Sequence, residues 1–136
     1  MYKRIGHVAI RVTDMEKALC FYCDGLGFKR KFALQDDKQR PWIEYLEIGP
    51  YFFVELFYDN EKREAIKQDP ERLGYLHLSI EVNNLKEYKK QIEKSGITFD
   101  GEIKMQTDNS WQLWATDPDG NRIEIMEYTQ QSKQIQ

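Results

Sequence analysis

Two stretches of this chain share one pattern and decide its fold: IGHVAIRVTDMEKAL, residues 5–19, and YLHLSIEVNNLKEYK, residues 75–89. Each opens with alternating polar and apolar residues, which predicts a strand with one buried face and one polar face. The polar faces carry His7, Ala9 and Arg11 in the first stretch and His77, Ser79 and Glu81 in the second. The chain is therefore an internal repeat of one supersecondary unit.

Helix-capping signals follow both strands. Thr13 and Glu16 have the Ser/Thr-x-x-Glu spacing of a capping box. Asn84 and Glu87 form a similar pair with asparagine as the cap. We therefore expect one helix directly after each strand.

The remainder of each repeat has the pattern of an antiparallel meander. The expected strands are residues 28–34, 42–48 and 51–58 in the first half and 98–105, 111–116 and 122–128 in the second. A charged segment, residues 59–74, links the halves. The sequence predicts an α+β fold within one domain over 1–136, built from two tandem βαβββ modules at about 5–58 and 75–128.

Length and composition limit the classes of function. The chain has 136 residues, of which 40% are hydrophobic and 32% charged with a net charge of −3, which is typical of one soluble globular domain. It has no basic stripe for nucleic acid, no membrane-spanning apolar run and no secretory h-region. Cys20 and Cys23 fall inside the first expected helix, which favours buried or half-buried structural cysteines over redox chemistry. We expect a cytoplasmic protein.

The two histidines, His7 and His77, occupy the same place in the two repeats. The last strand of each half carries a glutamate in an apolar setting: Glu55 follows His7 by 48 residues, and Glu124 follows His77 by 47. Imidazole and carboxylate together suit Zn²⁺, Ni²⁺, Co²⁺, Fe²⁺ or Mn²⁺. Each residue taken singly is typical of an ordinary strand position, but their match across the repeat favours one divalent metal ion held by all four.

Such a metal ion would retain open coordination positions, because two carboxylates neutralise it and four donors do not fill its shell. A metal in that state can polarise a carbonyl or stabilise an enediolate. A carboxylate that leaves the metal can act as a base. The four residues therefore predict proton-transfer chemistry on a small substrate.

Further motifs accompany the four residues. They are H-x-x-x-R-V from His7, F-Y-x-x-x-L-G-F from Phe21, V-E-L at 54–56, L-H at 76–77 and D-P-D-G-N-x-I-E from Asp117. On these residues the chain resembles the vicinal oxygen chelate superfamily of glyoxalases, bleomycin resistance proteins and dioxygenases, over about 5–128. The resemblance implies that the strands form a curved mixed sheet around one metal site and that two chains pair as a homodimer.

Within that superfamily the His-Glu-His-Glu pattern is most similar to glyoxalase I, or lactoylglutathione lyase. The resemblance implies a lyase or isomerase that converts the hemithioacetal of a 2-oxoaldehyde and a thiol to a 2-hydroxyacyl thioester. Glu124 would be the chief base and Glu55 its opposite partner. The alternatives are another enzyme of the superfamily, such as an Fe-dependent dioxygenase or a thiol transferase, and a non-catalytic small-molecule binding protein.

The resemblance also implies residues that contact substrate. Arg11 matches an arginine that helps to hold the glutathione carboxylate, although a solvated strand charge is the simpler interpretation. The residues expected to line the site are Phe53, Trp114 and Met126, and Lys104 would touch an anionic group; aromatic residues in strands are also common in cores. Asp59 replaces an asparagine of some glutathione-using relatives. An acid there would repel a carboxylate, which argues against glutathione as the thiol.

Overall fold

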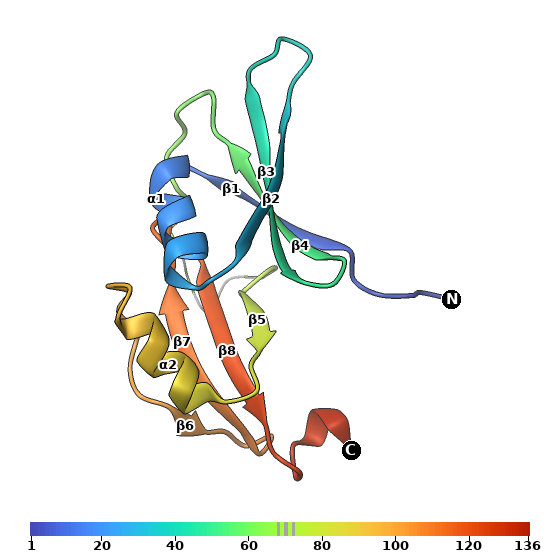
Figure 1. Ribbon diagram of the computed structural model, residues 1–136, viewed down its shortest axis with the longest axis vertical. Coiled ribbons are helices and arrows are strands. Elements are labelled where there is room, and N and C mark those ends of the chain that lie inside the picture. Colours follow the sequence, from blue (N-terminus) through green and yellow to red (C-terminus); the bar gives the residue numbers. More distant parts are fainter. Residues whose placement is uncertain (68, 70, 72) are drawn as a thin grey trace. The chain divides into compact units, whose positions relative to one another are not determined.

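Figure 1 shows the computed structural model, which describes residues 1–67, 69, 71 and 73–136. The chain divides into two compact units, residues 1–66 (unit 1) and 67–136 (unit 2). Each unit contains one mixed four-stranded sheet and one βαβββ module, so the predicted α+β fold with tandem modules is confirmed. The predicted linker includes residues 68, 70 and 72, which lie outside the described residues.

In unit 1 the strand order of the sheet is β1-β4-β3-β2. The strands are β1 (His7–Val12), β2 (Lys29–Gln35), β3 (Pro41–Gly49) and β4 (Phe52–Tyr58). The first pair, β1 and β4, is parallel, whereas the other pairs are antiparallel. A parallel pair needs a long crossover connection, which the intervening helix and hairpin supply.

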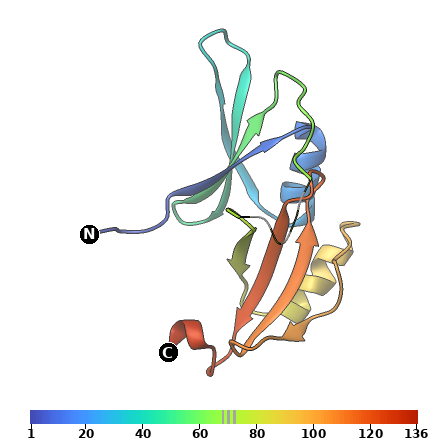
Figure 2. The ribbon, with the colours of Figure 1, turned by 180° about the vertical axis from the view of Figure 1, so that it is seen from behind.

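Unit 2 repeats this topology in the order β5-β8-β7-β6. Its strands are β5 (His77–Glu81), β6 (Lys104–Met105), β7 (Ser110–Thr116) and β8 (Arg122–Tyr128). Helix α2 (Leu85–Glu93) packs against β7 and β8, and the two opposite views in Figures 1 and 2 show it on one side of this sheet. A short 3₁₀ turn, η2 (Lys133–Ile135), ends the chain.

The N-cap of the first helix lies one residue later than predicted. Asp14, rather than Thr13, is the N-cap of α1 (Met15–Leu19), and its Oδ1 accepts a hydrogen bond from the Lys17 amide at 3.1 Å. The capping-box prediction for Thr13 is wrong because the ionised Asp14 carboxylate binds the amides at the positive helix end more strongly. In unit 2 the predicted cap is confirmed, since Asn84 Oδ1 accepts from the Glu87 amide at 2.9 Å.

After α1 the chain continues as a π-helical turn, η1 (Cys20–Gly25). Cys20 is exposed, contrary to the expectation for a structural cysteine, whereas Cys23 is half-buried. Burial raises the pKa of the Cys23 thiol, and the neighbouring Asp24 charge adds to this effect. Such a thiol is less reactive than a free one.

The strand predicted over 98–105 is much shorter in the structure. Only Lys104 and Met105 form β6, paired with β7. Upstream, Gly101 has φ +144°, and the Asp100 side chain accepts a hydrogen bond from Thr116 Oγ1 at 2.6 Å. The Asp100 amide also donates to the Trp114 carbonyl at 2.8 Å, so this segment lies beside β7 although it forms no continuous ladder with it.

One face of each sheet forms a core with its helix. The buried apolar residues include Ile10, Val12, Leu46, Val54 and Leu56 in unit 1 and Ile80, Leu85, Leu113, Ile123 and Ile125 in unit 2. Burial of each such side chain contributes about 1.5–3 kcal/mol relative to exposure. The opposite face of each sheet is therefore the one that can carry function.

Unit 1 also buries a charge on its core face. Glu44 is 1% exposed and accepts two hydrogen bonds from the Arg30 guanidinium, at 2.7 and 2.6 Å. The Tyr58 hydroxyl donates a third, at 2.9 Å. A buried carboxylate is tolerated when it is paired and hydrogen-bonded in this way.

Candidate metal centre

Cross-strand register places the predicted ligands of unit 1 on the polar face of its sheet. Residues directly opposite one another on neighbouring strands point to the same face. His7 is opposite Phe53, Glu55 is opposite Tyr45, and Arg11 is opposite Phe57. Since His7, Phe53 and Glu55 alternate with core residues, the whole predicted set of unit 1 shares one face.

The first half-site consists of His7 and Glu55. His7 Nδ1 lies 3.4 Å from Glu55 Oε1, and the Glu55 side chain is 7% exposed whereas that of His7 is 55% exposed. Tyr45 is opposite Glu55 in register, and its interaction with the Glu55 carboxylate raises the pKa of the Tyr45 phenol because it stabilises the protonated form. The carboxylate thus lies beside an imidazole and has a tyrosine opposite it on the neighbouring strand.

The second half-site consists of His77 and Glu124. His77 Nε2 lies 3.5 Å from Glu124 Oε2, and the Glu124 side chain is 10% exposed. Trp114 is opposite Glu124 in register. Its ring packs edge-on against the His77 ring, with centroids 5.0 Å apart, and the Arg122 guanidinium lies 4.1 Å above it.

The donor set of each half-site fits a divalent metal ion. A carboxylate this buried is costly unless it is paired or bound to a metal, and nitrogen next to oxygen suits first-row transition ions. Each half-site supplies two donors. Within residues 1–67, 69, 71 and 73–136, no group of three or more metal-capable side chains is assembled. The four-ligand site therefore stays a prediction.

Comparison with known proteins identifies the family. The model of the Glyoxalase/Bleomycin resistance protein/Dioxygenase superfamily matches residues 4–125. The chain belongs to this superfamily. Its members generally bind a divalent metal ion, and they include enzymes such as lactoylglutathione lyase and the metallothiol transferase FosB.

The relatives span the whole superfamily domain at low identity. The chain is 26% identical over 126 residues to "Uncharacterized protein YaeR" of Escherichia coli (92% of this chain and 96% of that protein). It is 24% identical over 128 residues to the lactoylglutathione lyase of Salmonella typhimurium (91% and 92%). It is 26% identical over 136 residues to the metallothiol transferase FosB of Staphylococcus saprophyticus (98% and 82%).

A solved structure shows the same fold. The glyoxalase family protein of Enterococcus faecalis superposes with a TM-score of 0.76 at 25% identity, and the match covers 93% of this chain and 98% of that one. The superfamily fold is thus shown for nearly the whole chain.

The remaining residues predicted to contact substrate lie on the same faces as the ligands. Arg11 donates from Nη1 to the Tyr58 carbonyl at 2.8 Å and lies 5.4 Å from the Phe57 ring centroid. In unit 2, register aligns Met126, Gln112 and Lys104 in one row beside Trp114 and Glu124. Met126 is 4% exposed, and Lys104 lies in β6.

Asp59 is neutralised by its own loop. Its carboxylate pairs with the Arg63 guanidinium at 2.6 Å and accepts backbone hydrogen bonds from Glu61 and Arg63. Its side chain is 2% exposed. Arg63 therefore offsets the repulsion between Asp59 and a carboxylate, which was the argument against glutathione. The i,i+4 spacing of the two residues could have indicated this pairing.

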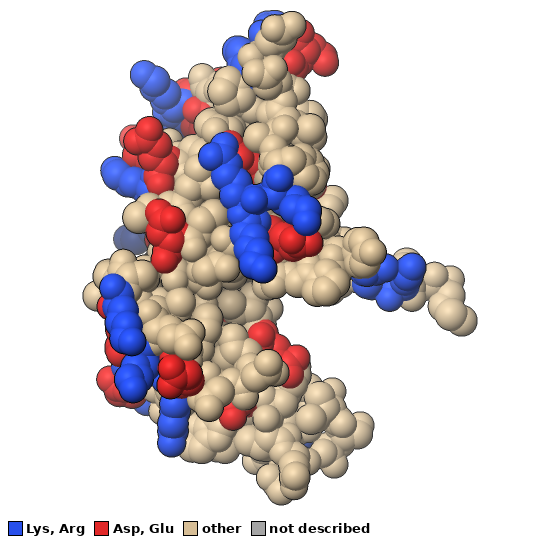
Figure 3. Space-filling view, in the orientation of Figure 1, with Lys and Arg blue, Asp and Glu red and all other residues tan. Residues whose placement is uncertain are grey.

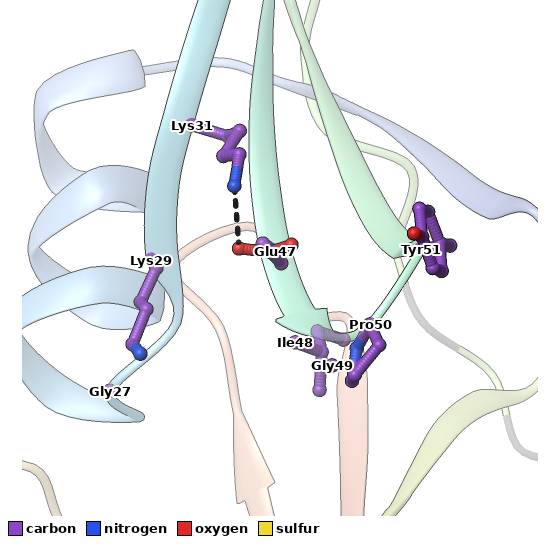
Figure 4. A pocket seen from close by; sticks show the side chains of 8 residues that line it. All are labelled: Gly27, Lys29, Lys31, Glu47, Ile48, Gly49, Pro50 and Tyr51. Carbon is purple, nitrogen blue, oxygen red and sulfur yellow. Dashed lines mark hydrogen bonds and ion pairs between the residues drawn. The ribbon is translucent and has the colours of Figure 1, made fainter.

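A pocket that sequence reasoning missed lies at the β3–β4 turn of unit 1. It has a volume of about 580 Å³, and Lys29, Lys31, Glu47 and Tyr51 are among its lining residues (Figure 4). Lys31 Nζ pairs with Glu47 at 3.2 Å. Glu47 is opposite Lys29 on one side and Phe53 on the other, and Phe53 is in turn opposite His7. This basic pocket is therefore on the same face of the sheet as the predicted ligands of unit 1.

Basic and acidic side chains are interspersed over the face that Figure 3 shows. Among the described residues, none of the helices has the length and apolar character needed to cross a membrane.

Proposed function

We propose that this protein is a metal-dependent lyase of the glyoxalase I type. It would convert the hemithioacetal of a 2-oxoaldehyde and a thiol to a 2-hydroxyacyl thioester. The observation that carries the proposal is the repeated pair of a nearly buried glutamate beside an imidazole, His7 with Glu55 and His77 with Glu124. The set of two histidines and two glutamates is that of glyoxalase I within the superfamily.

His7, Glu55, His77 and Glu124 would hold one ion of Zn, Ni, Co, Mn or Fe. When bound, this ion supplies Lewis-acid polarisation of the substrate oxygens. Glu124 accepts the proton from C1 of the hemithioacetal and returns it to C2, so that no redox partner is needed. Its low exposure shields the transferred proton from exchange with water.

Other residues would orient the substrate. Arg11 and Lys104 offer positive charge to the carboxylates of the thiol, and the basic pocket at Lys29 and Lys31 offers a second position for such a group. The apolar surface of Phe53, together with Met126 and Trp114, would contact the oxoaldehyde side chain. Because Arg63 neutralises Asp59, glutathione is a suitable candidate for the thiol.

The decisive experiment combines metal analysis with an activity assay. Purified protein should bind about one divalent ion per chain. It should then form thioester from methylglyoxal with glutathione, cysteine or coenzyme A, followed by the absorbance of the thioester. Chelator-treated protein is the control. The absence of turnover with every thiol after metal reconstitution would reject the lyase assignment.

A thiol transferase is the second candidate, favoured by the similarity to FosB over 98% of this chain. Such an enzyme adds a thiol to an electrophilic epoxide instead of isomerising a hemithioacetal. Incubation with fosfomycin and the same thiols distinguishes the two, because only a transferase consumes the epoxide. An iron-dependent dioxygenase and a non-catalytic binder are tested by the same metal and turnover measurements.

We also infer from the superfamily resemblance that two chains pair as a homodimer. Light scattering coupled to size-exclusion chromatography measures the mass directly. A single-chain mass at micromolar concentration would contradict the dimer without affecting the metal proposal.

A further inference from the structure

Arg122 lies beside the second half-site, on the same face of the sheet as its two ligands. In register it is opposite His77 of β5, and it precedes Glu124 by two residues on β8. Residues two apart on a strand point to the same face, with their Cα atoms roughly 7 Å apart. The matching position of unit 1, opposite His7, is Phe53. The fold therefore does not require a cation at this position.

An aromatic ring holds the Arg122 guanidinium in place. Its Cζ lies 4.1 Å from the Trp114 ring centroid, and the Trp114 ring packs edge-on against His77 with centroids 5.0 Å apart. Arg122 and Trp114 are both half-buried. A ring attracts a cation without supplying a polar acceptor for the five N–H donors of a guanidinium. The charge is thus positioned next to the ligands while its donors stay available.

Arg122 has no acidic partner in the part of the chain that the structure describes. The neighbouring carboxylates interact with other groups. Glu124 Oε2 lies 3.5 Å from His77 Nε2. On the other side, Thr116 is opposite Arg122 on β7, and its Oγ1 donates to Asp100 at 2.6 Å. A half-buried guanidinium without an acidic partner favours an anion that comes from outside the chain.

We propose that Arg122 binds a carboxylate on the electrophilic half of the substrate, a step that rests on the proposed lyase site. A guanidinium binds a carboxylate through two parallel hydrogen bonds. Because Arg122 lies next to His77 and Glu124, only a short carbon chain separates this carboxylate from the reacting carbons. The carboxylates of a peptide thiol are farther off, since the sulfur and several more bonds intervene. The substrate class is therefore the 2-oxoaldehydes that carry a carboxylate at the end of a short side chain.

Two chelators of equal length test this role without any turnover. Hydroxamates bind a metal ion through two neighbouring oxygens and contain no aldehyde. Succinic monohydroxamate ends in a carboxylate, whereas butyrohydroxamate ends in a methyl group at the same place. Protein loaded with Co²⁺ is titrated with each chelator by calorimetry. The wild type should bind the carboxylate form roughly 10- to 100-fold more tightly, which is the range for hydrogen bonds between charged groups.

Arg122→Met removes the charge and keeps an unbranched side chain that can pack on Trp114. The two hydroxamates should bind this variant with equal affinity. Arg11→Met is the matched control, because Arg11 also lies over a ring, 5.4 Å from the Phe57 centroid, but donates to the Tyr58 carbonyl at 2.8 Å. It should keep the wild-type preference for the carboxylate form.

A second variant, Arg122→Lys, keeps the charge without the paired donors and should retain part of the preference. An undiminished preference in Arg122→Met, or an equal loss of affinity for both chelators, would overturn the role of Arg122. The second result would mean that the side chain only supports Trp114 and His77. Wild-type protein that binds both chelators equally would reject this role and leave the lyase proposal standing. Protein that takes up no Co²⁺ would reject both.

Discussion

The two half-sites use the same ligands on the same strand positions, yet their surroundings differ. Facing the histidine is Phe53 in unit 1 but Arg122 in unit 2. Opposite the ligand glutamate, unit 1 has Tyr45 where unit 2 has Trp114. Further along the strand that carries the histidine, unit 1 has Arg11 where unit 2 has Glu81. Two glutamates that look equivalent in sequence are therefore made chemically unequal by the strands beside them.

The core faces differ in the same way. Glu44 of unit 1 lies opposite Leu56, and at the matching position of unit 2 Leu113 lies opposite Ile125. Unit 1 thus has a paired charge at this core position, and unit 2 has an aliphatic side chain there. The same backbone register is therefore compatible with a charged or an aliphatic residue at this position when every buried polar atom has a partner.

The largest expected effect comes from removing each ligand carboxylate in turn. Glu124→Gln should lower kcat/KM by about 10³-fold, since general-base catalysis supplies roughly 10²–10⁴. Glu55→Gln should lower metal affinity more and turnover less. Steady-state kinetics and metal titration of both variants measure this. Equal losses in the two variants would show that the carboxylates have equivalent roles.

Next in size is the contrast between the two cores. Glu44→Ala should lower the free energy of unfolding by about 3 kcal/mol, because it leaves Tyr58 and Arg30 without their partner. Leu113→Ala should cost a similar amount, about 2–5 kcal/mol, from the cavity alone. Urea denaturation followed by circular dichroism measures both.

A triple variant sharpens this second prediction. Glu44→Leu with Arg30→Met and Tyr58→Phe copies the aliphatic solution of unit 2 into unit 1. Since well-packed apolar residues can replace a buried ion pair at little cost, the variant should be close to wild type in stability. A loss as large as that of Glu44→Ala would contradict this account.

A difference between the two helices should give a smaller, pH-dependent change in the free energy of unfolding. Ala18 of α1 corresponds to Tyr88 of α2, and burial raises the pKa of Tyr88 to about 12. The unfolded phenol has a pKa of about 10, so this contribution is complete below that pH and is lost as pH rises toward 12. Over this interval the free energy of unfolding of the wild type should fall by about 1–2 kcal/mol more than that of Tyr88→Phe. Parallel urea curves at both ends of the interval measure the difference, and coincident pH profiles would refute it.

The smallest effect separates the two helix caps. Asn84→Ala should lower the free energy of unfolding by about 1 kcal/mol at any pH between 3 and 9. Asp14→Ala should also destabilise, but only above the carboxyl pKa. The Lys17 backbone hydrogen bond lowers the pKa of Asp14, so its contribution is present at neutral pH and lost on acidification. Thermal unfolding at neutral and acidic pH distinguishes a charged cap from a neutral one.

Much of the fold and the face of each predicted ligand could be inferred from sequence. Period-two alternation correctly assigned Phe53 to the face of Glu55, and Met126 to that of Glu124. The errors were confined to single elements. Asp14 displaced Thr13 as cap, although the repeat aligns Asp14 with Asn84, and β6 is confined to Lys104 and Met105. A pattern of hydrophobicity does not indicate which of two neighbouring polar side chains caps a helix.

By itself, the sequence determined the repeat, the strand faces and the pairing of one histidine with one glutamate per module, because a strand's two-residue period acts on every side chain alike. Only the tertiary structure decided which side chains surround each pair. Tyr45 beside Glu55, Trp114 beside Glu124 and Arg63 on Asp59 all depend on register between strands or on loop conformation. These depend on contacts between residues distant along the chain, or on backbone geometry, which local periodicity does not specify.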